Sequence, residues 1–117
     1  MKKFLVFLFI PIFSFSQSIV SEVNFLIKQK QFVKAELLAS NYAAQNPNNL
    51  NAIELLGDAY GHQKKWDDAI EQYKKLVDAN IANANYHYKY GGALGRKAQE
   101  VNKFQALGII GDVKEAF

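Results

Sequence analysis

The sequence predicts an all-α fold, an α-solenoid of stacked antiparallel helical hairpins that follows an N-terminal export signal. Three observations predict it. Apolar residues recur with the 3.6-residue period of helices that bury one face. The sequence also repeats itself at a spacing of about 34 residues, the length of one helical hairpin. Finally, the 117 residues are half hydrophobic and include no cysteine, so one domain must be stabilised by packing alone.

The first 16 residues are typical of a secretory signal peptide. Lys2-Lys3 gives a positively charged N-terminal region, and residues 4–13 form an apolar run. Ser14 and Ser16 occupy the −3 and −1 positions of a cleavage site before Gln17. The run is about half as long as the ~20 residues of a membrane-spanning helix. We therefore expect an exported bacterial chain, periplasmic or secreted, with no stable membrane span after cleavage. The alternatives are an uncleaved anchor and an ordinary buried helix.

The rest of the chain, residues 17–117, is expected to fold as paired helices. Pro47 ends the first pair because proline cannot donate to a continuing helix, and Asn48 or Asn49 can cap the helix that follows. Alternation of tyrosines over residues 86–90 would also suit a strand, but the repeat register favours a helix. The expected helices cover residues 18–28, 31–45, 50–63, 66–79 and 83–97.

The repeat is clearest around the middle of the chain. A shift of 34 residues places Phe32 on Trp66, Ala35 on Ala69 and Gly57 on Gly91. This helix–turn–helix period resembles the tetratricopeptide repeat (TPR) family. The resemblance implies about 2.5 repeats, with units at about 16–49, 50–83 and 84–117, of which the last is degenerate or truncated. The implied repeat core is Leu26, Phe32, Ala35, Ile53, Leu56, Gly57, Tyr60, Trp66, Ala69, Tyr73, Tyr90, Gly91 and Leu94.

Small residues have a specific role in this core. Gly57 and Gly91 lack a side chain, so we expect the partner helix to approach them closely, with Ala69 as the matching small contact. Gly92 and Gly95 lie off that contact, and the pattern gives no reason for them. Each glycine costs a helix ~1 kcal/mol relative to alanine.

In TPR proteins the first helices of the units line a concave groove that holds a segment of a partner. The resemblance therefore implies a protein–protein interaction module that binds a peptide or a helix. The alternative is a structural or spacer segment of a larger exported or envelope protein. The carboxylate clamp of some TPR proteins is not expected, since Val20, Leu55 and Asn85 depart from it. The register places Asn24, Ile27, Lys28, Asn51, Glu54, Leu55, Asp58, His62, Asn85, Tyr88, Lys89, Gly92 and Arg96 in the groove.

Nothing in the sequence indicates an enzyme, a cofactor or a metal site. His62 and His87 are the only histidines, whereas zinc needs three or four protein ligands, and the repeat gives His87 a core-facing position. Residues 91–97 are rich in glycine but lack the spacing and the preceding strand of a phosphate-binding loop. No clustered basic face points to a nucleic acid.

Residues 98–117 do not follow the repeat. We expect one helix over residues 98–107, a break over residues 108–111 and a helix N-cap at Asp112. Because the polar helix that usually closes a solenoid is missing, we expect the chain to be part of a longer protein. The alternative is that Phe117 packs against the residues of the break as a lid.

Overall fold

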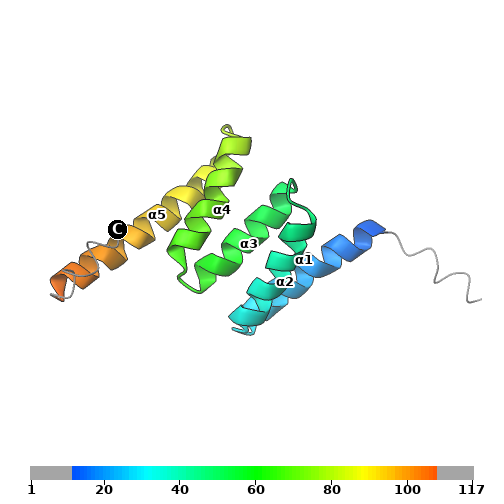
Figure 1. Ribbon diagram of the computed structural model, residues 1–117, viewed down its shortest axis with the longest axis horizontal. Coiled ribbons are helices and arrows are strands. Elements are labelled where there is room, and N and C mark those ends of the chain that lie inside the picture. Colours follow the sequence, from blue (N-terminus) through cyan, green and yellow to red (C-terminus); the bar gives the residue numbers. More distant parts are fainter. Residues whose placement is uncertain (1–11, 108–117) are drawn as a thin grey trace, which may run out of the picture.

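The computed structural model describes residues 12–107, and they form five α-helices in a row (Figure 1). No strand occurs within this range, so the all-α prediction is confirmed and the tyrosines of residues 86–90 lie in a helix. Among the described residues, no helix combines the length and the apolar character needed to cross a membrane. The helices are α1 (Ile12–Lys28), α2 (Phe32–Gln45), α3 (Leu50–His62), α4 (Trp66–Ala79) and α5 (Ala84–Ala106).

Two helices are longer than predicted. α1 begins at Ile12 and includes Ser14 and Ser16, the residues expected before the signal cut. α5 continues to Ala106, although we expected it to stop at Lys97 and a second helix to follow. The physical reason for the longer α5 is local, since residues 98–106 hold no glycine or proline and are rich in good helix formers. The expected break, the Asp112 cap and the Phe117 lid lie outside the described residues.

The turns of the structure recur at the 34-residue spacing. Lys30 and Lys64 both have a φ of 60° in the α1–α2 and α3–α4 turns, the left-handed conformation that often follows a helix end. Asn49 and Asn83 cap α3 and α5, and each side-chain oxygen accepts a hydrogen bond from the first helical turn. The predicted Asn49 cap is therefore confirmed, and Asn83 performs the same task one unit later.

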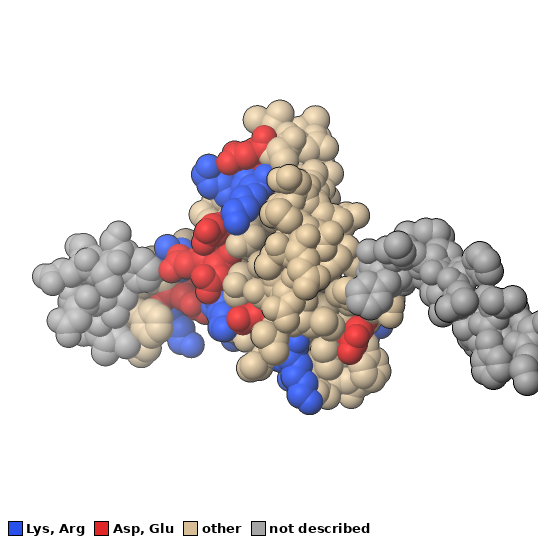
Figure 2. Space-filling model, turned by 45° about the vertical axis from the view of Figure 1, so that its right-hand side comes forward, with Lys and Arg blue, Asp and Glu red and all other residues tan. Residues whose placement is uncertain are grey.

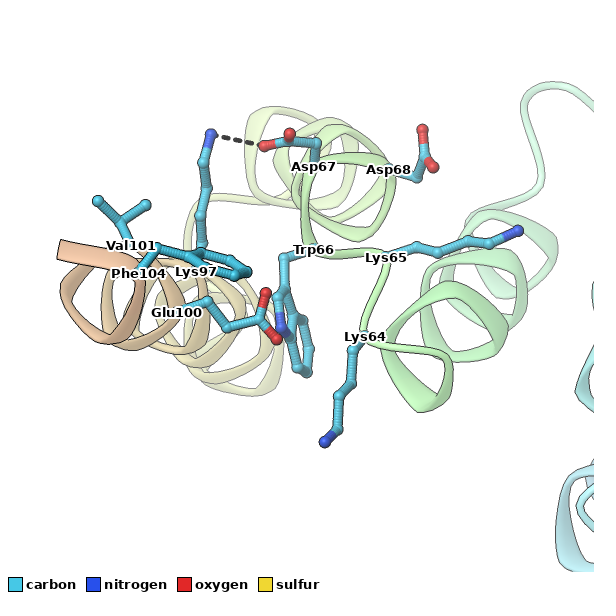
Figure 3. Close-up of a pocket in the computed structure, with 9 residues that line it drawn as sticks. All are labelled: Lys64, Lys65, Trp66, Asp67, Asp68, Lys97, Glu100, Val101 and Phe104. Atoms are coloured by element: carbon cyan, nitrogen blue, oxygen red, sulfur yellow. Dashed lines mark ion pairs between the residues drawn. The ribbon is translucent and has the colours of Figure 1, made fainter. Parts of the chain in front are cut away.

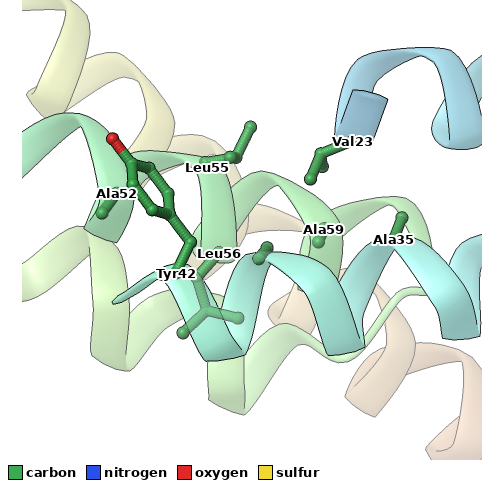
Figure 4. Packing of buried hydrophobic residues seen from close by; sticks show 8 residues of the cluster. Val23, Ala35, Tyr42, Ala52, Leu55, Leu56 and Ala59 are labelled. Carbon is green, nitrogen blue, oxygen red and sulfur yellow. The ribbon is translucent and has the colours of Figure 1, made fainter. Parts of the chain in front are cut away.

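Consecutive helices pack against each other, and α1 also contacts α3. One buried cluster joins the first three helices (Figure 4). In it Val23, Ala35 and Ala59 are fully buried, and the small volume of the two alanines lets the helix backbones approach. A second cluster around Leu76 joins α3, α4 and α5. Burying one large aliphatic side chain contributes ~1.5–3 kcal/mol, so these two clusters are the main source of stability.

Most of the expected core residues are buried or half-buried, but Gly91 and Leu94 are exposed. A Cβ atom at Gly57 would lie 2.6 Å from Cε1 of Tyr73. The close approach at Gly57 is therefore made by the tyrosine ring and not by Ala69. A Cβ atom at Gly91 would meet nothing within 4 Å. The prediction for Gly91 and Leu94 is wrong because α5 packs mainly on α4, with its other side uncovered in the described part of the chain.

Candidate functional site

A hollow of about 310 Å³ lies between α3 and the first half of α5, and we call it the α3–α5 groove. It contains half of the ten charged, amide and aromatic residues that the repeat register placed in a binding groove. Those five are Asp58, His62, Tyr88, Lys89 and Arg96, and the remaining lining is Gly61, Trp66, Tyr73, Gly92 and Ala93.

Several expected groove residues lie elsewhere. Asn24 and Lys28 are exposed on α1, and Asn51 is exposed in the first turn of α3. Leu55 is only 6% exposed and belongs to the first core cluster, against which Ile27 also packs. The prediction for Leu55 and Ile27 is wrong because α1 packs against α3 and covers this part of its face.

A polar network joins α3, α4 and α5 beside the groove. The Lys89 Nζ atom lies 2.9 Å from both carboxylate oxygens of Asp58 and 2.7 Å from Oε2 of Glu54. The Asn85 amide donates to Glu54 Oε2 at 3.1 Å, and the Tyr73 hydroxyl donates to Asp58 Oδ1 at 2.6 Å. Four of the predicted groove residues thus bond within this network, and their first effect is to fix α5 against α3.

The network shifts the pKa values of two of its members. Burial acts to lower the pKa of Lys89, but hydrogen bonds to Glu54 and Asp58 outweigh it, so the pKa lies above its usual value. Burial, followed by the hydrogen bond to Asp58, raises the pKa of Tyr73. Both shifts favour the states that these groups already hold at physiological pH, a charged Lys89 and a neutral Tyr73. Removing Lys89 would leave two neighbouring carboxylates without their cation, which is costly in a half-buried site.

The part of the groove that remains open to a ligand is aromatic and cationic. Tyr88 is 80% exposed and Arg96 is exposed. The His62 ring stacks on Phe32, with centroids 6.2 Å apart. A Cβ atom at Gly92 would meet nothing within 4 Å, so no side chain covers the α5 backbone at this position. The repeat register placed Gly92 in the groove, and Gly92 lines this hollow, although the glycine pattern alone gave no reason for a glycine at this position.

The second histidine differs from its prediction. His87 is exposed rather than core-facing, and its Nε2 atom lies 2.6 Å from the carbonyl oxygen of Ile81. The reason is its place at the α4–α5 turn, where no described helix covers that side of α5. Between residues 12 and 107, no three histidine, aspartate or glutamate side chains converge as metal ligands.

Neither a protein-family model nor a curated protein matches this sequence. The functional interpretation therefore rests on the geometry of the α3–α5 groove.

Proposed function

We propose that this chain is an exported TPR-type interaction module that binds an extended segment or a helix of another protein in the α3–α5 groove. The observation that supports it most is the convergence of Tyr88, Arg96 and His62 on one hollow beside a bare stretch of helix. The 34-residue recurrence of the helix caps and turns supports the TPR-type repeat. Export rests on the pattern of the first 16 residues.

Each open residue of the groove suits a polypeptide ligand. The Tyr88 ring offers a large contact area at a low entropic cost, and the Arg96 guanidinium can donate several hydrogen bonds to carbonyl or carboxylate oxygens. Gly92 leaves room for a ligand backbone to approach α5. The network around Lys89 holds the groove walls in place before binding, and such preorganisation lowers the cost of association.

One observation favours the alternative of a structural or spacer segment. Four of the predicted groove residues already bond within the network around Lys89, as they would if their only task were to fix α5. A spacer needs no exposed Tyr88, however, so this residue distinguishes the two functions.

The experiment selects peptides from a random library on the full chain and measures their dissociation constants. Tyr88→Ala should weaken binding by about tenfold, the loss of one good interface contact. Ile81→Ala is the control, because Ile81 is 76% exposed and lies outside the groove. Failure to select any peptide, or equal binding by both variants, would support the spacer.

A glycine pair tests the groove without removing a side chain. Gly92→Ala and Gly95→Ala both add a methyl group where nothing lies within 4 Å, but only Gly92 lines the groove. Both variants should be more stable by ~0.5–1 kcal/mol. Only Gly92→Ala should also weaken the selected peptides, and equal affinities for the two variants would argue against the groove.

A further inference from the structure

The second half of α5, which continues the first half without a break, creates a second hollow. Because α5 does not stop at Lys97, it runs past the α3–α4 turn and encloses a space of about 320 Å³ against the start of α4 (Figure 3). Trp66 from α4 and Val101 and Phe104 from α5 form its apolar walls. We call this space the Trp66 pocket. It is distinct from the α3–α5 groove, although the Trp66 indole lines both.

The positive charges around the Trp66 pocket are largely neutralised. The Lys97 ammonium lies 2.5 Å from Asp67, as Figure 3 shows. Lys65 points away from the pocket and pairs at 2.7 Å with Glu36 on α2. The third lysine of the rim, Lys64, also extends away from the indole in this view. Two of the three lysines that line the pocket are therefore paired with carboxylates, whereas Lys64 is exposed at the rim.

Asp68 and Glu100 are the two lining carboxylates with no ion pair within residues 12–107, and Asp68 points away from the indole in Figure 3. The half-buried Glu100 lies one helical turn from both Lys97 and Phe104, and its side chain lines the same space as the indole (Figure 3). Within residues 12–107, no hydrogen bond or ion pair engages the Glu100 carboxylate. In the space-filling view, acidic and basic side chains lie next to each other in this part of the surface (Figure 2).

We propose that the Trp66 pocket binds a cationic side chain, an arginine or a lysine, of a partner polypeptide. Tryptophan is the best aromatic partner for a cation that lies over its ring, and Phe104 supplies a second aromatic wall. A carboxylate forms its strongest hydrogen bonds with a charged donor, and Glu100 is placed to accept one. An acidic ligand would instead face the Glu100 charge. This site goes beyond the proposed function. Apart from Trp66, which lines both hollows, none of its residues lines the α3–α5 groove.

The test uses the full chain and N-acetyl-arginine amide as the probe. Trp66 is the only tryptophan, so its fluorescence reports binding directly. We expect a saturable change with the arginine and lysine amides and none with N-acetyl-glutamine amide or N-acetyl-glutamate amide. Glu100→Gln removes the charge at constant shape and should weaken the arginine probe by about tenfold. The matched control, Glu22→Gln at an exposed position of α1, should leave the affinity for the arginine probe unchanged.

A second variant guards against loss of folding. If the dichroism spectrum shows that Glu100→Gln is unfolded, Phe104→Leu keeps this wall of the pocket apolar, removes the ring and should likewise weaken binding of the probe. Equal responses to cationic and neutral amides, no saturable response, or full affinity in the folded Glu100 variant would overturn the proposal. Tyr88→Ala should not affect the arginine probe, so failure of the groove and failure of this pocket can be told apart.

Discussion

The α3–α4 hairpin and α5 share a sequence motif but differ in packing. Gly57 and Gly91 occupy equivalent positions of the repeat, yet a Cβ atom would collide with Tyr73 at the first and meet nothing at the second. Six of the 13 residues of α3 are buried, against two of the 23 in α5. A repeat motif therefore contributes to stability only where a neighbouring helix supplies the opposing surface.

The largest contrast is expected for leucine truncation. Leu76 of α4 is fully buried, whereas Leu94 of α5 is 41% exposed. Leu76→Ala removes core contacts and leaves a cavity, which should lower the free energy of unfolding by ~2–5 kcal/mol. Leu94→Ala should cost less than ~1 kcal/mol. Urea unfolding followed by circular dichroism measures both, and equal losses would mean that α5 is covered in solution.

The glycine pair sharpens the comparison, because its two members should change stability in opposite directions. Gly57→Ala pushes a methyl group into the Tyr73 ring, whose hydroxyl is held by Asp58, and overpacking should cost ~1–3 kcal/mol. Gly91→Ala meets open space and should gain ~0.5–1 kcal/mol from helix propensity. The same urea titration measures the free energy of unfolding of both variants. A loss at Gly91 as large as that at Gly57 would reveal a surface packed against this side of α5.

Local features of the fold could be predicted from the sequence, whereas the pairing of side chains between helices could not. Helical periodicity, Pro47 and the asparagine caps act within a few residues, so the predicted ends of α2, α3 and α4 agree with the structure to within one residue. The repeat register divided residues 83–107 into two helices at Lys97, whereas the structure has one, because the register says nothing of the local helix propensity that continues α5.

The candidate site was predicted only in part for the same reason. The register correctly brought His62, Tyr88 and Arg96 to one groove. It could not show that Lys89 bonds Glu54 and Asp58, since this depends on the directions of side chains on two helices that lie far apart in sequence. It also gave no sign of the Trp66 pocket, which exists only because α5 is longer than a repeat helix.

The last effect concerns pH, and it tests whether the polar network belongs to the well-packed region. The pKa values of Tyr73 and Lys89 are raised in the folded chain. Their contribution to stability is complete below the unfolded pKa values, ~10 for both residue types, and is lost as pH rises toward the folded values. Between the unfolded and the folded pKa values, the unfolded chain binds fewer protons than the folded chain. The free energy of unfolding should therefore fall there by up to ~1.4 kcal/mol per group and pH unit.

Tyr73→Phe separates this effect from general alkaline unfolding. The variant should start less stable at neutral pH, because Asp58 loses a hydrogen bond worth ~0.5–1.5 kcal/mol, but should then lose stability more slowly than the wild type between about pH 9 and 11. A residual slope should remain, since burial and then the Glu36 charge also raise the pKa of Tyr60. Urea midpoints across this range measure the slopes. Parallel slopes for wild type and variant would show that Tyr73 ionises as readily in the folded chain as in the unfolded one, and the tight packing assigned to the α3–α4 hairpin would then be wrong at the residue that contacts Gly57.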